Sequence, residues 1–155
     1  MATVQGDGTG IPAAARRLIQ PIMPRLQLPG VTHMIGYVTL GTNDKDRAAK
    51  FYDQLLAVMG AKRSLETEKY VAWGTSPTAP MLFIIKPADG KAATVGNGVM
   101  VALAASSKAE VDAVYQKAIA LGGKDEGPAG PRGDDFYAGY FRDSDGNKLT
   151  VFFAG

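Results

Sequence analysis

The chain repeats one pattern of residues at a constant offset of 63 positions. In each copy a short apolar strand is followed by a polar helix cap, a helix that carries an aromatic residue, and a glycine that ends the helix. The matching pairs are Leu40 and Leu103, Asp44 and Ser107, Tyr52 and Tyr115, and Gly60 and Gly123. A period of this length indicates a duplicated module rather than a solenoid of short repeats.

Each copy continues from its helix into three further strand-like segments. They cover residues 62–67, 70–73 and 81–86 in the first copy, and a segment near Lys124 followed by 136–142 and 148–153 in the second. Each copy is therefore predicted as a strand–helix–strand–strand–strand (βαβββ) module, at about residues 32–88 and 96–155. One such module exposes an apolar sheet face, so two modules must pack together to close a core in an α+β domain.

The strongest single motif is the turn before the final strand, Arg142-Asp143-Ser144-Asp145-Gly146-Asn147. Asp, Gly and Asn tolerate turn conformations and bond their own backbone, and aromatic and β-branched runs flank the motif. We predict a hairpin whose register is held by these side chains. Arg142, Asp143 and Asp145 are therefore assigned to turn chemistry and not to catalysis.

The chain resembles the vicinal oxygen chelate superfamily in three features taken together. These are the paired modules, Phe51-Tyr52 on the first helix, and the Arg-Asp-x-Asp-Gly-Asn turn. This superfamily includes glyoxalase I, extradiol dioxygenases and the bleomycin resistance proteins. The resemblance runs from about Thr32 to the C-terminus, and residues 80–87, 97–98 and 127–132 are similar to a glyoxalase-like bacterial branch. It implies two modules that pair into curled mixed sheets around a central cavity, and a homodimer.

In metal-dependent members the resemblance implies a His on the first strand, a His on the fifth and a Glu on the last. Here these positions are occupied by Tyr37, Met100 and Thr150. A phenol, a thioether and a hydroxyl are poor ligands for divalent metals. The chain has no Cys, and its single His, His33, is interpreted as a surface residue in a turn or as a residue at the rim of the cavity. We therefore predict no metal site and no cofactor.

The candidate ligand-binding residues are those whose side chains point into the predicted cavity. They are Tyr37, Trp73, Phe83, Met100, Tyr140, Thr150, Phe152 and Arg132. Tyr37, Met100 and Thr150 occupy the inward positions, and Phe152 shares the face of Thr150 because strand side chains alternate. The other aromatic residues contribute according to the register of their strands. Arg132 is placed at the rim, where it either pairs with an anionic group of the ligand or remains a solvated charge. The alternative is that Tyr37 and Met100 simply fill the core.

Composition limits the classes of partner. At 155 residues the chain can hold one domain with a sound core, and no apolar run approaches the roughly 18 residues of a membrane helix. The net charge of +2 lies in the first 30 residues, and the remainder carries 14 basic and 14 acidic residues. A neutral domain predicts no nucleic-acid footprint and favours a neutral or weakly charged, partly aromatic or hydrophobic ligand. No signal peptide is visible, so a cytoplasmic location is expected.

Residues 1–30 are predicted as an N-terminal extension, and residues 31–155 as the single glyoxalase-like domain. Residues 11–20 can form a short helix, and the prolines that follow enforce an extended path. Apolar residues between those prolines favour an arm that covers a sheet face or a dimer partner. The alternatives are a nonfunctional extension, a lid over the pocket and a basic transit-like peptide, although the segment is short and poor in serine for the last.

Two function hypotheses of different class remain. The first is a metal-free small-molecule binding protein of the glyoxalase/bleomycin resistance type. The second is a lyase or isomerase that works without metal, with Tyr37 as general acid or base. A phenol with a pKa near 10 needs positive neighbours to act at neutral pH, and Lys148 is the candidate neighbour. The missing metal ligands favour the first hypothesis, because the resemblance implies that the common mechanism of the superfamily is electrophilic stabilisation by a metal.

Overall fold

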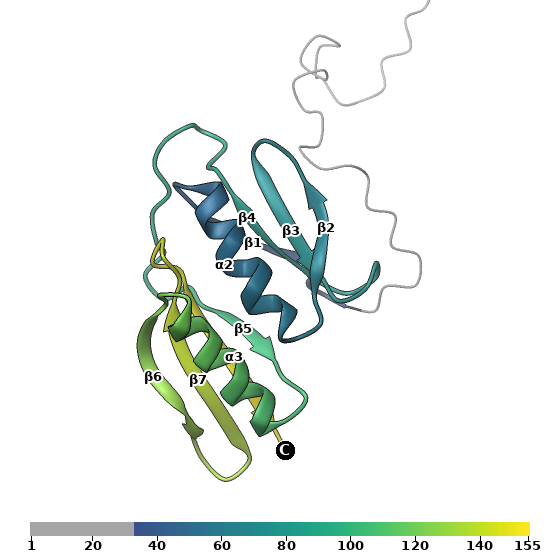
Figure 1. Ribbon diagram of the computed structural model, residues 1–155, viewed down its shortest axis with the longest axis vertical. Coiled ribbons are helices and arrows are strands. Elements are labelled where there is room, and N and C mark those ends of the chain that lie inside the picture. Colours follow the sequence, from purple (N-terminus) through teal and green to yellow (C-terminus); the bar gives the residue numbers. More distant parts are fainter. Residues whose placement is uncertain (1–32) are drawn as a thin grey trace, which may run out of the picture. The chain divides into compact units, whose positions relative to one another are not determined.

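The computed structural model describes residues 33–155, in which two βαβββ modules follow one another (Figure 1). The first module consists of β1 (Tyr37–Gly41), α2 (Lys45–Ala57), β2 (Lys62–Glu66), β3 (Tyr70–Gly74) and β4 (Met81–Ile85). The second consists of β5 (Val101–Ala104), α3 (Lys108–Ala120), β6 (Lys124–Pro131), β7 (Phe136–Arg142) and β8 (Lys148–Ala154). The predicted α+β class and the duplication are confirmed. The predicted N-terminal arm lies outside the described residues.

Both helices begin at the predicted caps. The Asp44 carboxylate accepts a hydrogen bond from the backbone N–H of Arg47, and the Ser107 hydroxyl accepts one from the N–H of Glu110. The Glu110 carboxylate in turn accepts hydrogen bonds from the N–H and the hydroxyl of Ser106. Such side chains satisfy N–H groups that have no partner within the helix, and each contributes about 1 kcal/mol.

Each module forms its own four-stranded mixed sheet. The strand order is β1-β4-β3-β2 in the first sheet and β5-β8-β7-β6 in the second. The first strand of each module pairs parallel with the last, and the other pairs are antiparallel. Hydrogen bonds of the described residues do not join β1 to β5, so both remain edge strands and the two sheets do not close into one.

One face of each sheet is covered by the helix of its own module (Figure 1). The helix-facing side chains alternate along the strands with those of the opposite side, which we call the helix-free face. The helix-facing residues of both modules belong to one apolar cluster. At its centre Leu55, Val114 and Phe141 are fully buried. Within residues 33–155 no helix is both long and apolar enough to span a membrane.

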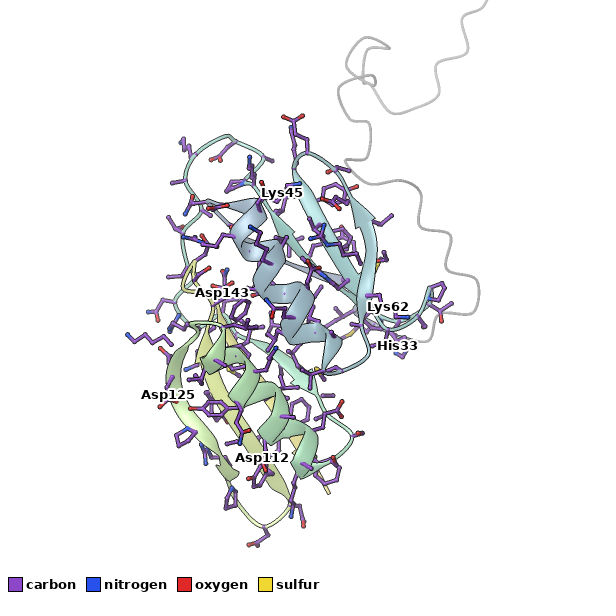
Figure 2. All side chains as sticks on the ribbon, in the orientation of Figure 1. His33, Lys45, Lys62, Asp112, Asp125 and Asp143 are labelled. Carbon is purple, nitrogen blue, oxygen red and sulfur yellow. The ribbon has the colours of Figure 1, made fainter. Side chains whose placement is uncertain are left out.

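The predicted turn before the last strand also joins the two modules. The Tyr52 hydroxyl on α2 donates to the Asp143 carboxylate at 2.7 Å, and the Thr42 hydroxyl donates to Asp145 at 2.7 Å. The Asn147 amide donates to the Gly41 carbonyl at 2.9 Å. Asp143 lies near the boundary between the modules in Figure 2. The turn chemistry predicted from the sequence is present, because Asp143 also accepts the backbone N–H groups of residues 145 and 147.

Two strands begin later than their apolar runs. β1 begins at Tyr37 rather than Met34, and β5 begins at Val101 rather than Val99. In the first case the reason is the partner strand: β4 begins at Met81, directly after a proline, so the residues before β1 have no strand beside them. Met34 is accordingly 96% exposed.

Candidate ligand-binding site

A cavity of about 670 Å³ lies where the edge strand β1 and the edge strand β5 face one another. We call it the edge pocket. Its walls come from β1, the C-terminal end of α2, the ends of β3 and β4, and residues 100–104 of β5 and its entry. The side chains that form these walls include Val38, Leu56, Met59, Met100 and Leu103.

The edge pocket is lined almost entirely by apolar side chains. Thr75 supplies the only side-chain hydroxyl among the lining residues, and none of them is ionisable in the normal pH range. Trp73 also lines it, but its indole N–H donates to the Asp53 carboxylate at 2.9 Å and is already satisfied. Such a cavity can exclude water from an apolar ligand, while the free backbone groups of β1 and β5 can bond a few polar atoms. It contains no general acid or base.

The helix-free face of the first sheet carries an aromatic cluster. Tyr37 and Tyr70 lie on either side of Phe83, with ring centroids 5.2 Å and 5.5 Å from it. Phe83 is fully buried, whereas Tyr37 is 47% exposed. The hydrogen bonds of residues 33–155 do not include the Tyr37 hydroxyl, and no ion pair of these residues reaches it. Tyr37 therefore has an accessible phenol in an apolar setting.

The helix-free face of the second sheet combines aromatic and charged side chains. Tyr140 is paired in register with Thr150, whose hydroxyl donates to the Gly139 carbonyl at 3.0 Å. The charged groups of Arg132 and Lys148 lie 5.6 Å and 5.8 Å from the centre of the Tyr140 ring. On the same face the ring of Phe152 stacks on Phe136 at 5.3 Å.

A carboxylate on β6 links two of the cations of this face. Glu126 forms ion pairs with Arg142 and, at 3.0 Å, with Lys148. The hydrogen bond from Arg142 is the main cause that holds the pKa of Glu126 below its usual range, and the hydrogen bond from Lys148 adds to it. Glu126 is thus ionised at neutral pH.

The structure distributes the eight predicted ligand-binding residues over three places. Met100 and Trp73 line the edge pocket, Tyr37 and Phe83 form part of the first sheet's aromatic cluster, and Tyr140, Thr150, Phe152 and Arg132 belong to the second sheet. Trp73 faces α2, because it pairs in register with the helix-facing Leu82. Their role in binding stays a prediction.

Sequence reasoning missed most walls of the edge pocket. Leu56 and Met59 were not among the residues assigned to the cavity, because helical periodicity favours core positions for such residues. The available signal was the duplication: the two edge strands are equivalent strands of the two copies of the module, and the end of the first helix belongs to one of these copies. His33 is exposed, in agreement with a surface position, and Figure 2 labels it near the start of the described chain.

The residues at the superfamily's ligand positions do not fit a divalent metal. Tyr37, Met100 and Thr150 offer a phenol, a thioether and a hydroxyl, and the Thr150 hydroxyl is engaged with a carbonyl. Tyr37 lies on one sheet and Thr150 on the other. In the part of the chain that the structure describes, no three His, Cys, Asp or Glu residues are close enough to share a cation.

The comparison with protein families matches residues 34–151 to the Glyoxalase/Bleomycin resistance protein/Dioxygenase superfamily. The chain belongs to this superfamily. A crystal structure of a glyoxalase/bleomycin resistance protein from Albidiferax ferrireducens T118 is similar, with 33% identity and a TM-score of 0.74 over 79% of this chain and 100% of the other. A comparison with curated proteins found no significant match.

Two more distant structures share the fold. Lactoylglutathione lyase from Agrobacterium tumefaciens is 23% identical, with a TM-score of 0.57 over 79% of this chain and 93% of the other. The fosfomycin resistance protein FosX from Mesorhizobium loti is 14% identical, with a TM-score of 0.58 over 81% and 94%. These identities establish the architecture alone, because one fold serves many chemistries.

Proposed function

We propose that this protein is a metal-independent small-molecule binding protein of the superfamily, and that the edge pocket holds an apolar, partly aromatic ligand. The observation that supports this most directly is the pocket itself. Its volume of about 670 Å³ lies within the range of roughly 300–1,000 Å³ that is usual for ligand sites. Its lining is apolar and lacks any ionisable group. Binding, rather than acid–base chemistry, is the activity such a lining supports.

Burial of apolar surface supplies the expected affinity. Each square ångström of apolar surface removed from water contributes about 25 cal/mol. Part of this gain is lost because the ligand gives up translational and rotational freedom. A ligand of one or two rings therefore needs most of its surface enclosed. The walls contributed by α2, β3 and β5 make that enclosure available.

The second candidate function is a metal-independent lyase or isomerase with Tyr37 as general acid or base. It is favoured by one observation: the Tyr37 phenol occupies the position of the first metal ligand and is 47% exposed. However, no cation pairs with this phenol in residues 33–155, and Lys148, the neighbour expected from the sequence, lies instead against Tyr140 and Glu126. We therefore rank this function below binding.

We further propose a homodimer, and we expect no nucleic-acid or membrane partner. The two open edge strands and the exposed apolar residues Ile35, Val99 and Met100 support self-association. Sedimentation at several concentrations would test the dimer. The cytoplasmic location expected from the sequence stays a prediction for cell fractionation.

The binding function is tested with a neutral apolar fluorophore, N-phenyl-1-naphthylamine, together with native mass spectrometry of the freshly purified protein. We expect saturable binding to the wild type. Ala102→Phe, which places a ring in the edge pocket, should weaken it at least about tenfold, because the displaced ligand loses more than about 1.4 kcal/mol of burial. Ala113→Phe makes the same change at an exposed position of α3 and serves as the control.

Equal affinity in Ala102→Phe and Ala113→Phe would overturn the proposed site. A bound divalent metal in the native mass spectrum would overturn metal independence. The enzyme alternative is tested by Tyr37→Phe on any organic compound found bound: unchanged binding with turnover abolished would establish it, and unchanged turnover would remove Tyr37 from catalysis.

A further inference from the structure

The side chain of Arg132 is held against β6 by hydrogen bonds to the backbone. Its guanidinium donates to the carbonyl of Pro128 at 2.6 Å and to that of Pro131 at 3.1 Å. A side chain at Gly127 would place its Cβ 3.4 Å from the guanidinium, and one at Gly130 would place it 3.3 Å away. The Arg132 guanidinium therefore packs closely over the two glycines of β6 and is held there by its two carbonyl partners.

Two cations converge on one ring without a shared counter-ion. Arg132 and Lys148 both lie within 6 Å of the centre of Tyr140, at 5.6 Å and 5.8 Å. The ring attracts each cation, but the two positive charges repel one another. Glu126 balances Lys148 and also pairs with Arg142. The ion pairs of residues 33–155 do not include Arg132.

The second sheet's helix-free face therefore has an excess of positive charge. Arg132, Lys148 and Arg142 are opposed there by a single carboxylate, Glu126. The acidic residues that follow Arg132 in the loop, at 134 and 135, are exposed, and the ion pairs of the described chain do not include them. The neutral total charge of the domain thus conceals a local concentration of positive charge.

This positive region is connected to the edge pocket through the sheet. Ala102 on β5 pairs in register with Thr150 on β8, which pairs with Tyr140 on β7. Neighbouring strands are about 4.8 Å apart, so Ala102 and Tyr140 are separated by about 10 Å. Ala102 lines the edge pocket. A ligand with two fused or linked rings is long enough to reach from one to the other.

We propose that Arg132 and Lys148 form an anion-binding site over Tyr140, and that the ligand of this protein is an amphipathic monoanion. Its apolar body occupies the edge pocket, and its carboxylate, sulfonate or phosphate group binds the two cations. Arg132 retains guanidinium N–H groups beyond those bonded to the two carbonyls, and these can donate to the anion. This inference rests on the proposed function.

A matched pair of fluorophores tests the proposal. 8-Anilinonaphthalene-1-sulfonate has the rings of N-phenyl-1-naphthylamine and adds one sulfonate. We expect the wild type to bind the sulfonate about tenfold more tightly, because a hydrogen bond to an ionised group is stronger than one between neutral groups. Arg132→Gln and Lys148→Gln should each remove about this factor for the sulfonate and leave the neutral probe unchanged. Lys50→Gln, an exposed lysine on α2, is the control.

The sulfonate's advantage should also fall as salt is added, since exposed charges are screened. Equal affinity of the two probes, or an unchanged ratio in both Gln variants, would overturn the anion site and leave the binding function intact. Failure of both probes to saturate the wild type, or their indifference to Ala102→Phe, would instead remove the proposed function. Thermal unfolding of each variant confirms that the sulfonate reports binding to folded protein.

Discussion

The two sheets are copies of one module, yet their helix-free faces differ. In the first sheet that face is aromatic and apolar, with Phe83 fully buried between two tyrosines. In the second it carries Tyr140 with Arg132, Lys148 and the Glu126 ion pairs. The helix-facing sides have stayed alike, because both belong to one core. The comparison shows that packing constrains both faces of the first sheet, whereas the helix-free face of the second sheet carries charged groups at its surface.

The largest expected effect on stability comes from removing a buried aromatic ring from the helix-free face of the first sheet. Phe83→Ala should lower the free energy of unfolding by about 3–5 kcal/mol, because a fully buried ring leaves a cavity. Phe152→Ala, on the half-buried face of the second sheet, should cost roughly half as much. Urea denaturation measures both. Equal losses would mean that the two helix-free faces do not differ in their contribution to stability.

The next effect concerns the helix tyrosines that occupy equivalent positions. Tyr52→Phe should cost about 1.5–3 kcal/mol, because it removes a hydrogen bond to the buried Asp143 carboxylate that joins the modules. Tyr115→Phe should cost less, since Tyr115 is half-buried and its hydroxyl lies beside the exposed Asp125. Urea denaturation at pH 7 provides the values, and a larger loss in Tyr115→Phe would contradict the asymmetry.

Alkaline pH should reveal the same contact. Burial is the main cause that raises the pKa of Tyr52 well above its ordinary value, and the Asp143 carboxylate raises it further. A group whose pKa is higher in the folded protein stabilises it fully below the unfolded value of about 10, and this contribution is lost as pH rises through the folded value. The wild type should therefore lose stability more steeply than Tyr52→Phe above about pH 10. The other tyrosines are common to both proteins, so parallel stability curves would refute the assignment.

The smallest effect on stability is expected at the edge pocket. Met100→Ala should cost less than about 1 kcal/mol, because the side chain is 42% exposed. It should nevertheless weaken N-phenyl-1-naphthylamine binding by about threefold, since Met100 lines the pocket. Met34→Ala, at a still more exposed methionine, is the control and should change neither property. A stability loss without a binding loss would indicate that Met100 only fills space.

Local chemistry made much of the fold predictable. Asp44 and Ser107 begin their helices because short side chains can bond N–H groups three residues ahead. The hairpin at 142–147 follows from turn residues between apolar runs. The duplication predicted two modules, because matched periodicities at a constant offset imply matched structures. The caps and the hairpin depend on neighbours within a few residues, and the duplication is visible as a repeat at an offset of 63 positions.

The candidate site was less predictable, because it depends on how distant segments meet. Trp73 was expected to contribute according to the register of its strand, and only the pairing with Leu82 shows that it faces α2 while it lines the edge pocket. Asp143 was assigned to its turn, and its bond to Tyr52, 91 residues away in the chain, could not be inferred from spacing. The alternation of side chains along a strand predicts that a sheet has two different faces. It does not predict which residues of neighbouring strands lie beside one another.

The sequence by itself determined two βαβββ modules, their helix caps, the last hairpin and the absence of strong metal ligands at the superfamily's positions. The modules, caps and hairpin follow from residue types, their periodicity and the repeat at an offset of 63 positions, whereas the ligand positions come from the resemblance to the superfamily. Only the tertiary structure decided that β1 and β5 do not pair with each other and border an apolar pocket, and that Arg132 and Lys148 converge on Tyr140. Those arrangements depend on strand register and on the packing of one module against the other, because both are properties of the assembled core rather than of any local segment.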